Sequence, residues 1–256
     1  MRMSTPARLA VASFAALVAV AAVARPSDAQ QGAGDGFLFH VPKASLTVHG
    51  GFAQPMASGG VFALARNELT LGRSDFGSGN FGLDLAIVAS PRVEVVLGFG
   101  RSSSSARSEY RDWVDNNDLP IEQTTSFQRT PITASLRYYL SDRGRRIGSV
   151  AWIPARFTPF VSAGAGMMAF KYEQSGDFVD SQTFGVFSDQ LTSKGWKGVL
   201  QAGAGAQWSL NQRMNLTGEV RYLHGTGSGD ANGGDFSGYK VNLSGVSTLI
   251  GLTLRL

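Results

Sequence analysis

Beyond residue 43, hydrophobic residues recur at every second position, and no long segment keeps the period of 3.6 residues that an amphipathic helix requires. In residues 93–99, for example, valine, leucine and phenylalanine alternate with Glu94 and Gly98. The alternating segments are 45–52, 81–87, 93–99, 132–140, 157–172, 196–210, 214–222 and 250–256. Because alternation is typical of strands with one apolar and one polar face, the sequence predicts an all-β domain of eight strands over residues 44–256.

The connectors between these segments alternate in length along the chain. Long connectors are predicted at about 54–79, 104–124, 174–193 and 225–237, short ones at Ser90-Pro91 and Asn211-Gln212-Arg213, and a medium one at 141–156. In an up-and-down antiparallel sheet, this alternation places the long connectors at one end. Short periplasmic turns and long outward loops are typical of transmembrane β-barrels, whose closure pairs every backbone group inside the bilayer.

The same alternation also fits a soluble barrel or sandwich with its apolar face inside. Charged residues make up only 16% of the chain, and Lys and Glu are scarce on the polar faces. Aromatic residues also gather near the predicted strand ends, as in the interfacial girdles of membrane barrels. They are Phe52, Phe99, Phe127, Trp196, Tyr222 and Tyr239 at the long-loop end, and Tyr138, Phe157 and Trp208 at the short-turn end. We therefore expect the apolar faces to contact lipid.

Two stretches leave alternatives open. Residues 60–72 could form an additional hairpin with Arg66-Asn67 at its tip, as a decoration of the first loop or as part of a ten-stranded barrel. Tyr239, Val241 and Leu243 have the opposite parity to the apolar residues of 250–256. Either a bulge near residues 244–245 shifts the phase, or this stretch lies above the bilayer.

The first residues are typical of a secretory signal peptide, with two arginines, 16 uncharged residues over 9–24, and small residues before a cleavage site. Cleavage is expected after Ala29, with Ala24 as the alternative, and residues 30–43 are expected to form a periplasmic lead-in. Removing residues 1–29 takes away three Arg and one Asp, which lowers the net charge from +4 to +2. Without a clustered basic face, a nucleic-acid-binding role is not expected.

Four stretches resemble the small eight-stranded outer-membrane β-barrel superfamily, which includes OmpA-like, OmpX-like and opacity-type proteins. They are Pro159–Gly166, Ala202–Leu210, Glu219–Tyr222 and Gly251–Leu256. The chain ends in Leu256, where such barrels usually end in an aromatic residue. The resemblance implies a monomer in the bacterial outer membrane, surrounded by lipid and lipopolysaccharide and inserted by the barrel-assembly machinery.

The inward parity of the predicted strands carries a set of charged and polar residues. They are His49, Asp84, Glu94, Arg137, Lys197, Glu219 and Arg221. Glu94 and Arg137 are expected to pair near the short-turn end, with Glu219 and Arg221 higher, near Asp84. Because an eight-stranded interior is just wide enough for side chains, we expect a structural plug of ion pairs. An ion pathway is the alternative.

Other chemistry has weaker support in the sequence. With no Cys and three His, neither a metal nor a cofactor is expected. His224 with Thr226 or Ser228 could form part of a lipid-modifying site, residues 112–118 and 230–235 could bind Ca²⁺, and the arginines at 101, 107 and 111 could contact lipopolysaccharide phosphates. Ordinary turns and solvated loops explain the same residues. The sequence thus predicts a non-enzymatic barrel with a filled lumen and a structural or surface-interaction role. A narrow channel and a lipid-modifying enzyme are the alternatives.

Overall fold

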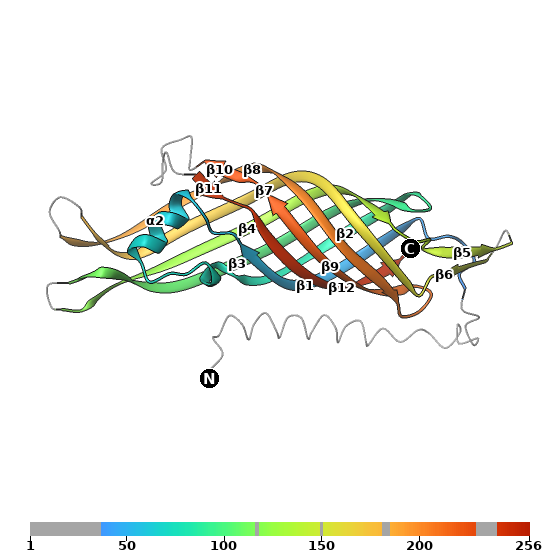
Figure 1. The fold of residues 1–256 in the computed structure, drawn as a ribbon, viewed down its shortest axis with the longest axis horizontal. Helices are drawn as coiled ribbons and strands as arrows, with labels where there is room; N and C mark the ends of the chain where they lie inside the picture. The colour runs from blue at the N-terminus through green and yellow to red at the C-terminus, as the bar shows by residue number, and fades with distance from the viewer. Residues whose placement is uncertain (1–36, 116–117, 149–150, 181–184, 229–239) are drawn as a thin grey trace.

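The computed structural model describes residues 37–115, 118–148, 151–180, 185–228 and 240–256 (Figure 1). Eight antiparallel strands form a closed barrel in the order β1-β12-β9-β8-β7-β4-β3-β2. Their bounds are β1 Ala44–Pro55, β2 Ser78–Ser90, β3 Val93–Val114, β4 Pro120–Tyr139, β7 Phe157–Val179, β8 Val186–Ser209, β9 Met214–His224 and β12 Gly245–Arg255. The predicted eight-stranded up-and-down barrel is therefore confirmed.

The two faces of the strands point as the alternation predicted. Leu83, Leu97, Leu136 and Leu216 project outward and are 47%, 51%, 58% and 45% exposed, whereas the residues that alternate with them are buried and mostly polar. An apolar exterior suits contact with lipid, and a polar interior suits side chains that pair with one another inside a closed barrel. We call this outward apolar surface, which ends near Phe99 on β3 on the side away from the short turns, the apolar band. Following the orientation that the sequence predicts, we call the end beyond Phe99 the extracellular end.

Four strands continue far beyond the apolar band. β3 and β4 are 22 and 20 residues long, and β7 and β8 are 23 and 24. The predicted long loops 104–124 and 174–193 are therefore wrong, because these residues form tall hairpins joined only by 115–119 and 180–185. Above the band, the outward side chains of these strands are polar, so the alternation that marks the membrane-facing segments is lost there.

The first long connector contains helix α2, Gly60–Glu68, and a 3-10 helix η2, Ser74–Phe76. The predicted hairpin over 60–72 is wrong, and so is its ten-stranded variant. Val61, Phe62, Ala65 and Leu69 are buried, and their spacing of one, four and eight residues places them on one side of a helix.

An apolar cluster fills the extracellular end of the barrel interior, and we call it the apolar plug. Its members are Ala57, Val61, Phe62, Ala65, Leu69, Leu71, Phe76, Phe127, Met168, Phe170, Tyr172, Val199, Leu223, Val241 and Leu243. Phe62 of α2 makes edge-on ring contacts with Phe76, Phe127 and Tyr172 at 5.0, 5.1 and 5.4 Å. Phe127 therefore faces inward, and its predicted place in the outer girdle is wrong.

Val241 and Leu243 need no shift of phase. Both are fully buried in the apolar plug and face inward, like Ser247 and Leu249 of β12. The predicted bulge is wrong, since the interior at this level contains an apolar cluster, beside buried polar residues such as Arg129. Two short strands, β10 Thr226–Ser228 and β11 Lys240–Asn242, pair beside α2. Tyr239 lies outside the described residues.

A second hairpin lies at the opposite, short-turn end. β5 Gly144–Ile147 pairs with β6 Ala151–Pro154 inside the predicted medium connector. Leu38 of the lead-in bridges to Trp152 of β6, so the described part of the lead-in lies at this end of the barrel. The predicted signal peptide falls outside the described residues, and within the described ranges no helix is long and apolar enough to cross a membrane.

Candidate functional site in the barrel interior

The closed barrel gathers six of the seven predicted interior residues. His49, Asp84, Glu94, Arg137, Glu219 and Arg221 come from five different strands and are at most 8% exposed. Lys197 lies apart from them, higher on the inward side of β8 and beside Gly227. Strand register explains the grouping, because Glu94 lies directly opposite Arg137 across the β3–β4 pair.

Arg221 makes the closest contacts in the middle of the barrel. Its Nη2 atom lies 2.8 Å from Asp84 Oδ2 and 3.1 Å from Glu219 Oε2, and its Nε donates to Glu219 Oε1 at 3.1 Å. His49 Nε2 lies 3.5 Å from the other oxygen of Asp84. One guanidinium thus joins two carboxylates from β2 and β9, which fixes these strands relative to each other.

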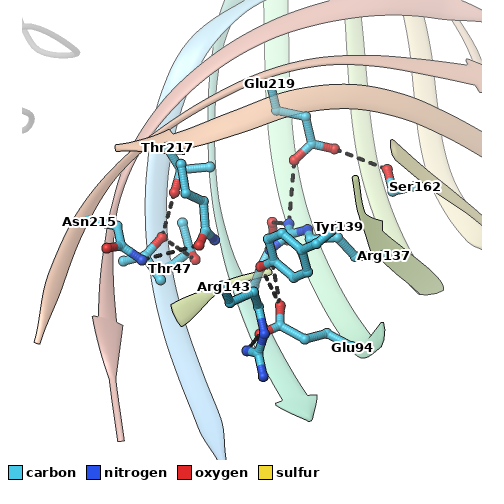
Figure 2. Close-up of polar contacts among 12 residues, drawn as sticks. Thr47, Glu94, Arg137, Tyr139, Arg143, Ser162, Asn215, Thr217 and Glu219 are labelled. Atoms are coloured by element: carbon cyan, nitrogen blue, oxygen red, sulfur yellow. Dashed lines mark hydrogen bonds and ion pairs between the residues drawn. The ribbon is translucent and has the colours of Figure 1, made fainter. Parts of the chain in front are cut away.

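Arg137 connects this group with the short-turn end. Its Nη2 lies 3.5 Å from Glu219 Oε2 and 3.9 Å from Asp84 Oδ2, while Nη1 lies 3.7 Å from Glu94 Oε2. Figure 2 shows it between Glu219 and Glu94, and its guanidinium lies 4.4 Å from the centre of the Phe160 ring. Arg137 therefore interacts with all three interior carboxylates.

A third arginine, which the alternation could not reveal, completes the group. Arg143 follows β4 and turns back into the barrel mouth, where its Nη1 lies 2.5 Å from Glu94 Oε1 (Figure 2). The Tyr139 hydroxyl donates to the other oxygen of Glu94 at 2.8 Å. The medium connector contains Arg143, Arg145 and Arg146, and of these Arg143 turns inward, with a side chain that is 14% exposed.

We call Asp84, Glu94, Glu219, Arg137, Arg143 and Arg221 the charge network. It holds three carboxylates and three guanidinium groups, so its formal charges cancel. Charges removed from water are costly unless they are paired and hydrogen-bonded. The balance provides the pairing, whereas Arg137 Nε and Nη1 and Asp84 Oδ1 form no hydrogen bond with the residues that the structure describes. Hydroxyl and amide groups occupy the neighbouring interior: Thr253 bonds to Thr47 at 2.8 Å and to Thr217 at 2.7 Å, and Asn215 donates to Gln207 at 3.1 Å.

The voids left within this interior are small. One is lined by His49, Asp84, Thr217 and Glu219, and another, at the short-turn end, by residues that include Glu94, Arg143 and Trp152. Each has room for about one water molecule. Among the residues that the structure describes, no group of three or more potential metal ligands occurs.

His224, the candidate for lipid-modifying chemistry, ends β9 on the outer surface. Its Nδ1 lies 3.4 Å from the Tyr222 hydroxyl and 3.3 Å from Ser244 Oγ. Ser244, rather than Thr226 or Ser228, is thus the hydroxyl partner, and it is 3% exposed and bonded to the backbone of Gly225. Within the described ranges, His224 forms no ion pair with a carboxylate. These contacts tie two strand ends together.

The remaining candidates lie in the extracellular part. Asp115 accepts a hydrogen bond from the Leu119 amide at 2.8 Å, which is the turn chemistry that competes with calcium binding. Residues 230–235 lie outside the described part of the chain. Arg101, Arg107 and Arg111 project outward from β3 and are exposed.

Comparison with known proteins finds similarity in fold only. No family model and no curated protein matches the chain. Neisserial surface protein A is 11% identical with a TM-score of 0.45, over 86% of this chain and 97% of that one. OprG from Pseudomonas aeruginosa is 13% identical with a TM-score of 0.45, over 86% and 99%. A major outer membrane protein from Thermus thermophilus is 14% identical with a TM-score of 0.45, over 85% and 100%.

The fold assignment rests on this chain's own barrel rather than on these low similarities. Closure leaves no unpaired edge within the apolar band, the outward residues there are apolar, and the inward ones are polar. These are the properties of a barrel whose solvent is lipid. The chain therefore folds as an eight-stranded antiparallel β-barrel with the apolar exterior and polar interior of a transmembrane β-barrel.

Proposed function

We propose that this protein is a non-enzymatic outer-membrane barrel with a closed lumen, which acts as an anchor for an extracellular interaction surface. The observation that carries the proposal is the filling of the interior at two levels. The apolar plug occupies the extracellular end, and the charge network occupies the middle and the short-turn end.

Conduction through such an interior would need a continuous polar path. The plug offers apolar side chains such as Phe62 and Met168, both fully buried, where a permeating ion would lose its hydration without gaining a partner. At the other end, Arg143 and Trp152 of β6 line the small void beside Glu94. The matched charges of the network favour a register-fixing role over an ion pathway.

The tall strands support the interaction part of the proposal. We call β3, β4, β7 and β8 beyond the apolar band, together with α2, β10 and β11, the head. Its outward side chains are largely polar, while Trp113 and Phe187 near the two hairpin tips are 44% and 45% exposed. Recognition residues are often found on projecting segments of rigid scaffolds.

Planar-bilayer recording tests the closed lumen. The wild-type protein is expected to show no discrete current steps, because both levels are filled. A variant in which residues 59–69 are replaced by a Gly-Ser linker, combined with Arg143→Ala, serves as the positive comparison and is expected to leak. Reproducible steps in the wild type would overturn the closed lumen and favour the narrow channel.

Site-specific photocrosslinking in intact cells tests the interaction surface. A photoreactive amino acid replaces Trp113 or Phe187 in the head, and Leu97 in the apolar band provides the lipid-facing control. Discrete protein or glycan adducts at the head positions, absent at Leu97, are expected. If neither head position gives an adduct that the control lacks, the interaction role is wrong.

A further inference from the structure

The surface of the short-turn end is almost entirely basic. Among the residues that the structure describes in its lead-in, turns and medium connector, Asp142 is the only acid, and it is paired with Arg92. The exposed basic residues here, which we call the basic end, are Lys43, Arg92, Arg145, Arg146, Arg156 and Arg213. A surface with one sign of charge attracts partners of the opposite sign.

The β5–β6 hairpin projects from the barrel at this end (Figure 1) and is part of the same surface. The Arg255 guanidinium lies 5.4 Å from the centre of the Trp152 ring of β6. The backbone amide of Arg255 donates to the Arg213 carbonyl at 2.7 Å. Because Arg146 of β5 lies directly opposite Trp152, these contacts connect the basic residues of the hairpin with those of the neighbouring turn.

The outer edge of β5 presents backbone groups as well as charges. The amide and the carbonyl of Trp152 both bond to Leu38, at 2.8 Å each, so they point away from β5. Opposite residues in an antiparallel pair either bond to each other or both point away, so the amide and the carbonyl of Arg146 point away from β6. Among the described residues, β6 is the only strand that pairs with β5.

We propose that the outer edge of β5 binds an extended acidic segment of a periplasmic protein, which adds as a strand beside β5. In strand addition, main-chain hydrogen bonds provide affinity and side chains select the partner. Arg145 and Arg146 are adjacent in a strand and therefore lie on opposite faces of the hairpin. Acidic residues on either face of the added strand would thus lie near a cation.

The charges and the backbone edge together favour this partner over simpler ones. A second copy of the chain would bring its own arginines to the edge, and like charges that lie opposite in a sheet are destabilising. A lipid headgroup would neutralise the arginines but offers no row of amides and carbonyls to the edge of β5. The inference concerns the end opposite the head, and it depends neither on the closed lumen nor on the extracellular interaction surface.

Fluorescence anisotropy of a labelled peptide of alternating glutamate and valine tests the proposal, with the full barrel in zwitterionic detergent. The double variant Arg145→Gln with Arg146→Gln removes both cations of the hairpin. The matched control, Arg107→Gln with Arg111→Gln, removes two exposed cations of β3 in the head. Heat-modifiable gel migration establishes that all proteins are folded before their dissociation constants are compared.

Two single variants separate strand addition from charge attraction. Arg146→Gln and Arg146→Pro remove the same charge, but only proline also removes the outward amide. Proline is accepted on an edge strand where the amide does not bond to the neighbouring strand. A peptide with proline in place of valine keeps its charge but loses amides that a strand needs, which gives the same comparison from the side of the ligand.

We expect about a tenfold weaker affinity for the hairpin double variant, and an affinity within about twofold of the wild type for the head control. Arg146→Pro should bind about fivefold more weakly than Arg146→Gln, and the proline peptide more weakly than the valine peptide. No binding to the wild type, or equal losses in the hairpin and head variants, would overturn the site. Equal affinities of the proline and glutamine variants would refute strand addition. Phosphatidylglycerol that displaces the peptide at equal concentration would identify a lipid surface and refute the polypeptide partner.

Discussion

Arg137 lies within 4 Å of all three interior carboxylates and is 1% exposed. Replacing it therefore leaves Asp84, Glu94 and Glu219 with only two guanidinium groups in a space that water barely enters. Breaking a buried ion pair from one side typically costs about 3–5 kcal/mol. This cost makes Arg137 the most informative position at which to test the charge network.

We expect Arg137→Met to lower the urea midpoint of the refolded barrel, with a loss of about 3–5 kcal/mol in the free energy of unfolding. Tryptophan fluorescence and gel migration measure this midpoint. Adding Glu219→Gln to the same variant should recover part of the loss, because one uncompensated charge is removed. The exposed Arg92, whose Nε lies 2.7 Å from Asp142 Oδ1, provides the control: Arg92→Met should leave the midpoint unchanged. Equal midpoints for the Arg137 and Arg92 variants would contradict the structural role of the charge network.

At the level of single residues, the sequence predicts interior side chains well where alternation applies. Glu94 and Arg137 could be paired from the sequence alone because both lie near a short turn on neighbouring strands. Arg143 could not be found in this way, since it lies in a connector, where no period tells which arginine turns inward. Lys197 has the parity of an inward residue, but it lies nearer the extracellular end than the charge network. Parity tells which face a side chain is on and carries no information about its height along a tilted strand.

Among the structural elements, α2 decides how the extracellular end is closed. Phe62 contributes three edge-on ring contacts to the apolar plug, whereas Leu64 of the same helix is 36% exposed. We expect Phe62→Ala to destabilise the plug by about 3–5 kcal/mol, because it leaves a cavity among rings that cannot close around it. Leu64→Ala should have a much smaller effect.

Limited proteolysis across residues 56–77 reports this difference in the folded barrel, with cleavage expected to be faster in the Phe62 variant than in the Leu64 variant. A barrel that resists protease equally in both variants would mean that α2 is held by something other than its apolar side.

The wrong predictions for the tall hairpins and for Phe127 share one physical cause. Sequence alternation was interpreted for a single environment, with apolar residues outside, and above the band the environment is reversed. In the head, Phe127 and Tyr172 face inward while Ser126 and Glu173 face outward. The tall hairpins therefore resemble loops in the sequence, if strands are recognised only by apolar residues at the outward positions. Helix α2 was missed because its helical period extends over only nine residues.

For the whole molecule, the prediction that can be tested most directly is that the apolar band contacts lipid. Leu136 on β4 is 58% exposed to the outside, and in a bilayer that side chain contacts lipid. We expect Leu136→Arg to destabilise the inserted barrel by about 2–4 kcal/mol, as found for arginine at the midplane of such barrels. Ser126→Arg, outward on the same strand but in the head, should have little effect.

The measurement is the folded fraction in lipid vesicles during a urea titration, read as the heat-modifiable band on a gel. If Leu136→Arg were tolerated as well as Ser126→Arg, the outward face would be in water, and the membrane assignment would fall. The sequence alone could predict this surface, because the alternation of apolar and polar residues within each strand is a local pattern that marks its outward face. It could not predict the head, whose core is assembled from α2, Leu223 and Leu243, which are distant along the chain.

The four tall strands pass from the membrane into the head without interruption. From Arg101 to Val114, β3 extends roughly 45 Å along its own axis, several times the thickness of a headgroup layer. Except for a register shift between Glu109 and Val114 in the β3–β4 pair, these strands continue from the barrel into the head, so the hairpins keep a set distance and direction relative to the cell surface. A molecule bound at the tips would thus be held in one orientation. A force applied to it would be transmitted along the strands to the hydrogen-bonded sheet of the barrel.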